Sequence, residues 1–576
     1  MKSKMNAVTC CSAILFLLFS GTGAVTVNVN PAVKYQEFEG WGTSICWWGN
    51  IIGKFPQQTR DSIMDLIFDT ADGLGLSMIR YNIGGGDAPS HTHMQTGKMM
   101  EGFKSGENAS YDWTKDAAQR WVVDAAKQRI PEKWFITEAF SNSPPYWMTV
   151  SGCASGGAGG SNNLKSDYYT QFADYLTTVV QHFKDEWGIT FRTLEPMNEP
   201  ENGWTSGAQQ EGCSFSHENQ VKLIREVKKK IDEKQLTTVI SASDGNTYSS
   251  TTASYNFYDA TIKSYISQVN THGYFGGSRT DLQAAVARDG KRLWASEIDG
   301  SGADYPFDQW THNHNDIVPG LDIANRVIRD LRDLKANGWV FWQIVESEQA
   351  QTTLNKNWGC IHADFNGGSK YHITKKFHAL RQFTSFIRPF SKMISIDNND
   401  AVACISPEQD RLIIVQRNAG NSAVSYEYKV SDFEQVGSPV SVWRSSATEN
   451  LKKIDDLAVV NGTLAASSPA RSITTYVIPL LPTAAFYPGK TADRGIAEVN
   501  INGSTLNLKF KAQENRADLK IYNLNGDIVK SVALRTTAGL IHSNSYTLSD
   551  MTNGYYVVKI SSGKDIIHTS KIMLVK

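Results

Sequence analysis

Two glutamates in this chain have the side-chain type and the position needed for acid–base and nucleophilic chemistry. Glu199 comes directly after Asn198 and before Pro200, where the chain has just left a short apolar run. Glu297 closely follows the apolar run Leu293–Ser296. Two carboxyl groups can cleave a glycosidic bond when one protonates the leaving oxygen and the other attacks the anomeric carbon. We therefore take Glu199 and Glu297 as candidate catalytic residues.

The residues that end the other apolar runs fit the same chemistry. They are mostly carboxylates, amides and aromatic residues, namely Trp47, Trp48, Arg80, Asn82, Glu138, Asn142, Asp244, His272, Tyr274, Trp342 and Gln343. No lysine ends a run, which disfavours a Schiff-base aldolase, and a single histidine does, which disfavours a zinc or iron hydrolase. Position alone does not select the catalytic pair, because strand-end carboxylates are often members of structural ion pairs. The competing carboxylates are Asp87, Glu138, Glu195 and Glu346.

The elements that must position these residues alternate regularly from about residue 38 to residue 390. Short runs rich in Val, Ile, Trp and Phe are typical of buried parallel strands. Eight such runs, alternating with helix-like segments, predict a (β/α)8 barrel over 38–390, with function where the strands end. The predicted strands are Glu39–Ile45, Ser77–Ile83, Trp134–Phe140, Thr193–Asn198, Val239–Ser243, Val269–Tyr274, Leu293–Ile298 and Trp339–Ile344. The predicted helices include Gln57–Ala71, Thr114–Gln128, Tyr168–Glu186, Asn219–Glu233 and Asp322–Ala336.

Two all-β parts are expected beside the barrel. Strand-like runs separated by turn signals predict a side β-sandwich over 391–482, to which residues 25–37 are expected to add a strand. The runs are Ala401–Ile405, Arg411–Gln416, Ser425–Val430 and Ser472–Ile478. After a predicted linker at 483–494, residues 495–576 predict a small all-β domain. Its runs include Asp518–Tyr522, Tyr555–Ile560 and Ile572–Val575, and its Asn-Gly pairs at 525–526 and 553–554 fit tight turns.

The N-terminal segment predicts export. Lys2 and Lys4 precede the apolar run Ala13–Phe19, and small residues follow it, so residues 1–24 have the form of a signal peptide rather than a membrane span. No later segment is apolar for long enough to cross a membrane, so none is expected after signal removal. Lys and Arg number 57 against 58 Asp and Glu, a net charge of -1, which offers no field for nucleic acid.

The cysteines predict covalent ties rather than a metal site. Removal of the signal peptide leaves Cys46, Cys153, Cys213, Cys360 and Cys404. No Cys or Cys/His group has zinc spacing, so we expect no metal and no cofactor. Cys153 and Cys213 follow neighbouring strands of the predicted barrel, and the Gly-rich loop at 151–161 would gain from a crosslink. We predict a Cys153–Cys213 disulfide, with Cys46–Cys360 as a second candidate pair.

Several motifs, in the order of the strands, carry a resemblance to a known family. Thr193-Leu-Glu-Pro-Met-Asn-Glu-Pro200 and Trp294-Ala-Ser-Glu297 resemble the acid/base and nucleophile motifs of clan A glycoside hydrolases. Four further motifs narrow the resemblance to family 30: Glu39-Gly-Trp-Gly42, Ile79-Arg-Tyr-Asn-Ile-Gly-Gly85, Glu138-Ala-Phe-Ser-Asn-Ser-Pro-Pro-Tyr-Trp-Met148 and His272-Gly-Tyr274. The resemblance covers roughly residues 25–480 and implies a barrel with a side β-sandwich.

The resemblance also implies a role for individual residues. Glu199 would be the general acid/base and Glu297 the nucleophile of a retaining mechanism. Asn198 would bond the 2-hydroxyl of the reacting sugar, and Arg80 and Tyr274 would keep Glu297 ionised and oriented. The remaining candidate substrate-binding or supporting residues are Trp48, Asn142, Trp147, His272 and Trp342. Two of these have plain alternatives, since Trp342 could be barrel-top packing and His272 a core histidine.

Within the family, the segment from Glu138 to Met148 and the loop around Cys153 most resemble endo-β-1,6-galactanases, which attack side chains of arabinogalactan. The alternatives are other β-linked glycans, such as β-1,6-glucan or glucuronoxylan, and a non-catalytic glycan-binding surface protein. Residues 495–576 resemble a type IX secretion sorting domain, which would make the secretion machinery a partner and place the protein outside the cell. A small carbohydrate-binding module is the alternative for this segment.

Overall fold

The computed structural model describes residues 23–88, 91–95, 97–299, 310–368, 370–480, 497–523, 528–562 and 565–574. It divides into two compact units, Met1–Leu480 and Leu481–Lys576. The predicted linker at 483–494 lies outside the described residues, and so does the predicted signal peptide apart from residues 23 and 24. No helix among the described residues is long and apolar enough to span a membrane.

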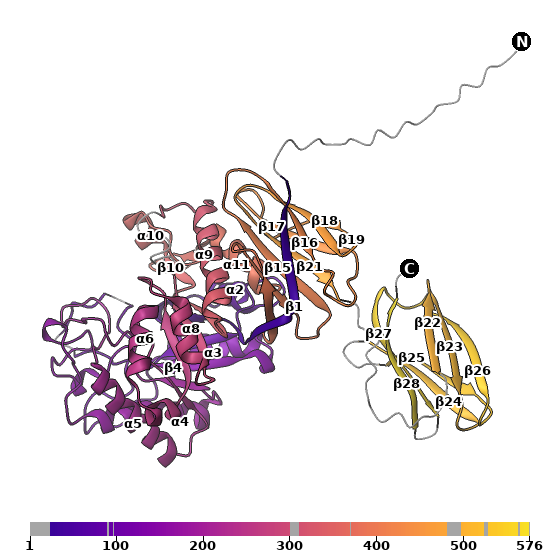
Figure 1. Cartoon of the computed structure of the whole chain (residues 1–576). Coiled ribbons are helices and arrows are strands. Elements are labelled where there is room, and N and C mark those ends of the chain that lie inside the picture. Colours follow the sequence, from indigo (N-terminus) through magenta and orange to yellow (C-terminus); the bar gives the residue numbers. More distant parts are fainter. Residues whose placement is uncertain are drawn as a thin grey trace, which may run out of the picture. The chain divides into compact units, whose positions relative to one another are not determined.

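The first unit is built on a closed barrel of eight strands, each parallel to its described neighbours (Figure 1). Its strands are β2 (Gly40–Ser44), β3 (Met78–Asn82), β4 (Ile136–Phe140), β5 (Thr193–Glu195), β6 (Val239–Ser241), β7 (Ile266–His272), β8 (Arg292–Ile298) and β9 (Gly338–Phe341). They are buried almost throughout, because helices cover the outside and side chains fill the inside. The predicted (β/α)8 barrel is therefore confirmed.

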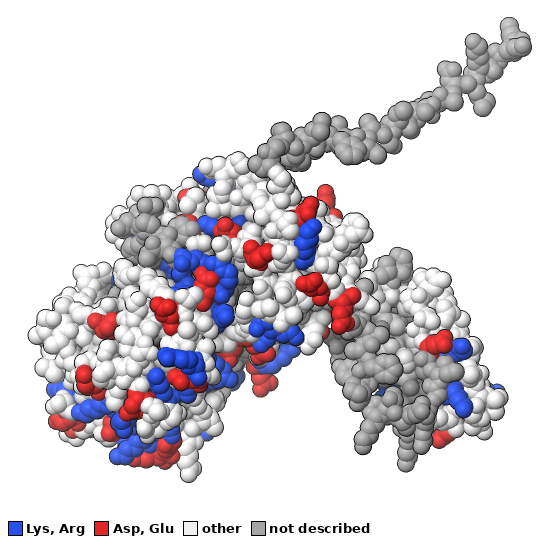
Figure 2. Space-filling view, viewed as in Figure 1, with Lys and Arg blue, Asp and Glu red and all other residues white. Residues whose placement is uncertain are grey.

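Helices follow the barrel strands and form the outer layer. They are α1 (Trp48–Ile52), α2 (Gln57–Phe68), α3 (Ala117–Arg129), α4 (Tyr169–Trp187), α5 (His217–Glu233), α6 (Tyr248–Phe257), α7 (Ala260–Tyr265), α8 (Arg279–Ala287), α9 (Val318–Arg329), a π-helix (Asp330–Leu334), α10 (Glu348–Leu354) and α11 (Lys375–Thr384). Basic and acidic side chains are interspersed over the region of α4 and α5 in Figure 2. On α5 they form the pairs Lys228–Asp232 at 2.5 Å and Lys230–Glu233 at 2.7 Å.

Two element boundaries differ from the sequence prediction for identifiable reasons. The predicted strand Thr193–Asn198 ends at Glu195, because Pro196 has no N–H to continue the ladder. The predicted helix Asp322–Ala336 instead begins at Val318, with Pro319 in its first turn, where a missing N–H costs no bond.

A β-sandwich with its own hydrophobic core packs on the barrel. Its ten strands lie in the order β18-β17-β21-β15-β14-β13-β1-β16-β20-β19. They are β1 (Val25–Phe38), β13 (Ser391–Ile396), β14 (Ala401–Ile405), β15 (Arg411–Asn418), β16 (Val424–Lys429), β17 (Val440–Ser445), β18 (Lys452–Leu457), β19 (Val459–Val460), β20 (Thr463–Ser468) and β21 (Ser472–Pro479). β1 pairs antiparallel with β13 and parallel with β16. Helices α9 and α11 join the two parts, since Arg417 Nε donates to the Leu321 carbonyl at 2.9 Å and Thr475 Oγ1 to the Gln382 carbonyl at 2.9 Å.

The second unit is all-β, as predicted for the C-terminal segment. One sheet has the order β22-β23-β26 and the other β25-β24-β27-β28. The strands are β22 (Ala497–Asn502), β23 (Thr505–Lys511), β24 (Arg516–Tyr522), β25 (Ile528–Arg535), β26 (Ile541–Thr547), β27 (Gly554–Ser562) and β28 (Asp565–Leu574). A core of Leu506, Leu508, Phe510, Leu519 and Ile560 is buried in it.

Candidate active site

Glu199 and Glu297 lie together at the carboxyl ends of two barrel strands. Glu297 belongs to β8, and Glu199 follows β5; their exposed fractions are 4% and 6%. Glu199 has a φ of 46°, and its N–H donates to the Asp244 carbonyl at 3.0 Å. One carboxylate oxygen of each glutamate and a nitrogen of His272 all lie within 4.8 Å of one another. The barrel thus brings the two predicted catalytic residues into one site.

Glu297 is held by a cation and a phenol. Arg80 Nη1 donates to Oε2 at 3.0 Å, and the Tyr274 hydroxyl donates to Oε1 at 2.9 Å. Burial raises the pKa of Glu297 to about 7, against the lowering effect of the His272 and Arg80 charges. The two predicted supporting residues therefore contact the predicted nucleophile directly.

Arg80 is the centre of a fully buried charge network. Its guanidinium also pairs with Glu138 at 3.1 Å, bonds Asp244 and lies 4.0 Å over the Phe140 ring. Asp244 accepts from Ser296 Oγ at 2.6 Å. Burial acts to raise the pKa of Asp244, but Arg80 and His272 outweigh it and lower this pKa. A single cation shared by three carboxylates fixes the position of its side chain, and with it that of Glu297.

Glu199 is oriented by amide donors that the sequence prediction did not include. Asn246 Nδ2 donates to Oε1 at 2.5 Å, and Asn202 Nδ2 donates to Oε2 at 2.6 Å. Trp204 Nε1 donates to the Glu199 carbonyl at 3.2 Å. Asn246 follows the strand-end residue Asp244 by two positions, which is a usable signal. Asn202 and Trp204 lie in the loop after β5 and have no sequence signal beyond their closeness to Glu199.

His272 connects the two glutamates and is not a plain core histidine. Its Nδ1 lies 3.1 Å from Glu199 Oε1, while Nε2 lies 3.1 Å from Asp244 Oδ1 and 3.5 Å from Glu297 Oε2. Burial disfavours the imidazolium, but the charges of Glu297 and Asp244 outweigh it and raise the pKa of His272 well above its ordinary value. The carboxylates on both sides of the ring therefore favour its protonated form.

The adjacent residues Trp47 and Trp48 lie in different hydrophobic clusters. Trp48 is fully buried in the barrel core, and its Nε1 donates to the Ser44 carbonyl at 2.8 Å. Trp47 packs edge-on against Trp342 with ring centroids 5.2 Å apart, and its buried Nε1 has no hydrogen-bond partner among the described residues. The turn into α1 directs Trp48 inward, so no contact among the described residues supports a substrate role for it.

The remaining predicted residues lie at different places. Asn198 is 6% exposed, and its Oδ1 has no hydrogen-bond partner among the described residues. Asn142 Nδ2 donates to Cys46 Sγ at 3.7 Å. Trp147 Nε1 donates to the Lys104 carbonyl at 2.9 Å, and its ring packs against Tyr168 and lines a cavity of about 450 Å³ that also includes Asp174 of α4. No contact from Trp147 to either catalytic glutamate occurs among the described residues.

The predicted Cys153–Cys213 disulfide is not formed. Both cysteines are buried free thiols, as are Cys46 and Cys360 of the second candidate pair. Cys153 Sγ lies 2.8 Å from Ser155 Oγ and 3.4 Å from His93 Nε2, whereas Cys213 Sγ contacts the Ser214 carbonyl at 3.8 Å. The loops are neighbours as predicted, but the two thiols contact different partners and not each other, so the prediction is wrong.

A barrel with two adjacent carboxyl groups at the ends of β5 and β8 has the site of a glycoside hydrolase. The family model for O-glycosyl hydrolase family 30 matches residues 24–354, and the chain belongs to that family. The model for a secretion system C-terminal sorting domain matches residues 502–576, which indicates export to the cell surface or secretion.

Individual relatives agree with this assignment. An endo-β-1,6-galactanase of Hypocrea rufa is 27% identical over 485 residues, which cover 79% of this chain and 94% of the relative. An exo-β-1,6-galactobiohydrolase of Bifidobacterium longum is 24% identical over 72% of this chain and 35% of its own length. Among solved structures, a conserved exported protein from Bacteroides fragilis has a TM-score of 0.65 at 21% identity, covering 78% of this chain and 100% of that one.

Proposed function

We propose that this protein is a secreted retaining endo-glycosidase that hydrolyses β-1,6-galactan side chains of arabinogalactan by double displacement. The observation that carries the mechanism is the closeness of Glu199 and Glu297, whose nearest carboxylate oxygens lie within 4.8 Å. Retaining glycosidases have carboxyl groups about 5–5.5 Å apart, whereas inverting enzymes need about 6.5–9.5 Å to admit water. The closeness of the two carboxyl groups therefore supports a retaining rather than an inverting mechanism.

In this mechanism Glu297 attacks the anomeric carbon. The attacking carboxylate must be ionised, and Arg80 and Tyr274 both donate to it. Arg80 is fully buried and forms ion pairs with Glu138 and Asp244, so its guanidinium stays in place and holds Glu297 at the reacting position. The bond from Glu297 to the sugar forms as the bond to the leaving oxygen breaks.

Glu199 delivers the proton to that leaving oxygen and later takes one from the attacking water. Two carboxyl groups this close do not ionise together readily, and Arg80 contacts Glu297 but not Glu199 in the described contacts. In the proposed mechanism Glu199 is therefore assigned the role of proton donor. Asn202 and Asn246 fix the direction of its carboxyl group. Asn198, with an unpartnered buried oxygen, is the residue placed to bond the 2-hydroxyl of the sugar.

The proposal that the substrate is a galactan rests on the comparison with the Hypocrea rufa endo-β-1,6-galactanase, which aligns over 94% of its length. The relative acts on β-1,6-galactan by its name, and the alignment includes barrel and β-sandwich. The signal-peptide form of residues 1–24 and the sorting domain at 502–576 support secretion.

Product analysis tests the proposal. The enzyme is incubated with arabinogalactan treated to expose its β-1,6-galactan, with β-1,6-glucan and glucuronoxylan in parallel, and the E297Q variant is the control. We expect short galacto-oligosaccharides of several lengths whose first-formed anomer is β. Faster cleavage of either other glycan would overturn the substrate, an α-anomer would overturn retention, and no cleavage of any glycan would favour a glycan-binding protein.

A further inference from the structure

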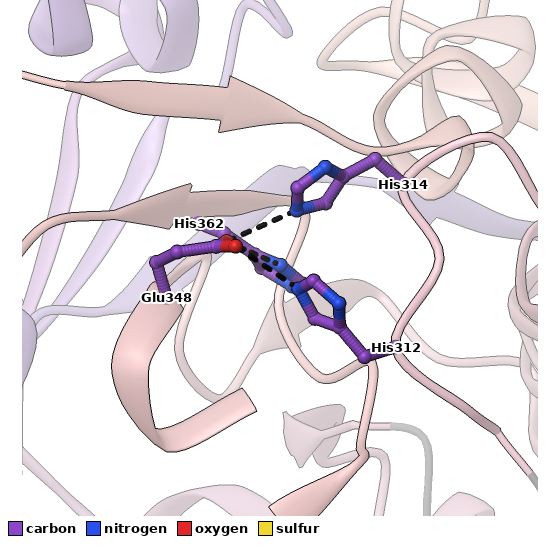
Figure 3. Close-up of side chains that lie close together, drawn as sticks. All are labelled: His312, His314, Glu348 and His362. Carbon is purple, nitrogen blue, oxygen red and sulfur yellow. Dashed lines mark hydrogen bonds and ion pairs between the residues drawn. The ribbon is translucent and has the colours of Figure 1, made fainter. Parts of the chain in front are cut away.

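Three histidines and a glutamate converge near the barrel mouth, apart from the site described above. His312 and His314 lie between β8 and α9, Glu348 is the first residue of α10, and His362 lies on β11 (Ile361–Ala363). Their side chains point toward one another, with Glu348 in the middle (Figure 3). We call these four residues the histidine cluster.

The distances in the histidine cluster match those between ligands of one metal ion. Glu348 Oε1 lies 3.1 Å from His312 Nε2, and Glu348 Oε2 lies 3.0 Å from His314 Nε2 and 3.4 Å from His362 Nδ1. One ligand atom of each of the four residues lies within 4.8 Å of the others. Ligands about 2.0–2.1 Å from a tetrahedral zinc ion are about 3.3 Å from one another.

The surroundings of His362 support a metal site independently of the distances. The ring nitrogen of His362 that carries no proton faces another hydrogen-bond acceptor. His362 Nε2 lies 2.7 Å from the Trp358 carbonyl, so this nitrogen carries the ring proton. His362 Nδ1 is then an acceptor; it is fully buried and has no hydrogen-bond partner among the described residues. It faces Glu348 Oε2, which is also an acceptor. Two lone pairs directed at each other repel unless a proton or a metal cation lies between them, and a metal ion would satisfy both at once.

The hydrogen bond from His362 Nε2 to the Trp358 carbonyl is typical of a metal-binding histidine. An imidazole that binds a metal usually donates its other N–H to a carbonyl or carboxylate, which fixes the tautomer.

The chain around the cluster holds the ligands in place before any ion binds. Asn355 Oδ1 accepts from the His312 N–H at 3.2 Å, and Asn357 Nδ2 donates to the Asn313 carbonyl at 2.9 Å. The Lys375 N–H donates to the His314 carbonyl at 2.9 Å. The His314 ring also stacks on His372, with centroids 4.6 Å apart. The geometry is therefore supported from outside the cluster.

We propose that His312, His314, His362 and Glu348 bind one divalent transition-metal ion, with zinc as the best match. Imidazole and carboxylate ligands suit zinc, and four protein ligands make a closed, structural site rather than a catalytic one. The ion ties the segment after β8, the strand of Glu297, to the segment after β9, which carries Trp342. This proposal is independent of the substrate proposed above.

Metal content and zinc binding test the site directly. Protein freed of any histidine tag is treated with chelator, incubated with ZnCl₂ and dialysed, and its zinc is measured by mass spectrometry. We expect about one zinc per wild-type chain and none in the H314A and E348Q variants. His372 stacks on His314 without belonging to the cluster, so H372A is the matched control and retains zinc, as does H217A in α5.

A second measurement separates loss of the site from loss of the fold. Zinc in excess of its Kd by about 100-fold should raise the Tm of wild type by roughly 5 °C and leave the Tm of folded E348Q unchanged. Co²⁺ in place of zinc should give the visible absorption of a tetrahedral site in wild type only. The proposal is overturned if wild type retains no zinc, or if folded H314A and E348Q bind it as wild type does. In the first case the cluster is a set of histidine–glutamate ion pairs.

Discussion

His272 Nδ1 lies 3.1 Å from Glu199 Oε1, and the same ring reaches Glu297 Oε2 through Nε2 at 3.5 Å. One buried imidazole therefore contacts both catalytic carboxyl groups. A change of charge on either glutamate alters the field at the other through this ring. His272 thus acts as a positioning residue for the pair, beyond the role that its strand-end position predicted.

Replacing His272 with Gln tests that role. The amide keeps one bond to Glu199 but carries no charge between the carboxylates, so kcat should fall roughly 100-fold on polysaccharide through misplacement of the pair. The pH–rate profile should also shift, which a merely structural residue would not cause. The measurement is kcat against pH for both enzymes. An unchanged profile, with kcat within a factor of two of wild type, would show that the ring only fills space.

Azide rescue separates the roles of the two glutamates. In E199A an activated aryl β-glycoside still leaves without a proton, but the glycosyl-enzyme accumulates because no base activates water. Azide needs no base, so it should restore turnover and give the β-glycosyl azide. In E297A no glycosyl-enzyme forms, activity should fall by several orders of magnitude, and azide should enter from the vacated face to give the α-azide.

Proton NMR of the two azide products is the measurement. The E199Q and E297Q variants are matched controls, because an amide leaves no space for azide at the vacated position. Exchange of the two anomers between the alanine variants would reverse the role assignment. Absence of the β-azide from E199A would contradict a covalent intermediate.

The buried ionisable groups predict a pH-dependent stability. The pKa of Glu297 rises from 4.5 to about 7 in the folded protein, so its contribution is fully present below pH 4.5 and is lost as pH rises through 7. The raised pKa of His272 acts in the same direction. The E297Q variant lacks the first term, so its stability relative to wild type should increase between pH 5 and pH 8, by on the order of 3 kcal/mol.

Denaturant unfolding of both proteins at several pH values measures this difference. The E233Q variant is the control, because the pKa of exposed Glu233 is instead lowered by Lys230, so its relative stability should not rise with pH. A stability difference between E297Q and wild type that stays constant from pH 5 to 8 would contradict the raised pKa of Glu297.

The adjacent tryptophans give a paired prediction. In W48F the Ser44 carbonyl loses its 2.8 Å partner and a cavity forms in the core, so stability should fall by about 1–3 kcal/mol. In W47F the lost N–H has no partner in the described structure, so stability should hardly change. If the free N–H serves the sugar, W47F should instead raise KM on polysaccharide. The measurements are unfolding curves and KM for both variants. A KM of W47F equal to that of wild type would remove Trp47 from the substrate site.

Much of the first unit could be predicted from the sequence, because its buried strands are apolar runs and its catalytic residues directly follow two of them. The choice between Trp47 and Trp48 could not, since two adjacent tryptophans at a strand end give the same pattern whichever one faces the core. The disulfide prediction failed for a similar reason, because it also depended on the direction of side chains. The barrel order predicts which loops are neighbours, but not where the Cys153 and Cys213 side chains point.

The histidine cluster shows a different limit of sequence reasoning. His312, His314, Glu348 and His362 belong to three separate segments, so their spacing matches no metal-binding pattern. Only the path of the chain after β8 and β9 brings them together. The absence of zinc spacing in the sequence therefore does not test for a site of this kind, and the prediction of no metal stays a prediction.

The position of β1 constrains the order in which the first unit is completed. Phe38 of β1 pairs with Ser391, and Val25 with Tyr426, so the first described strand has no partner until about 350 further residues exist. During synthesis this strand is an unpaired edge that offers its backbone to any passing chain. Closure of the sandwich therefore depends on contacts of very long sequence separation, and contacts of this kind form slowly. A protein built in this way benefits from a holding chaperone until its C-terminal half has emerged.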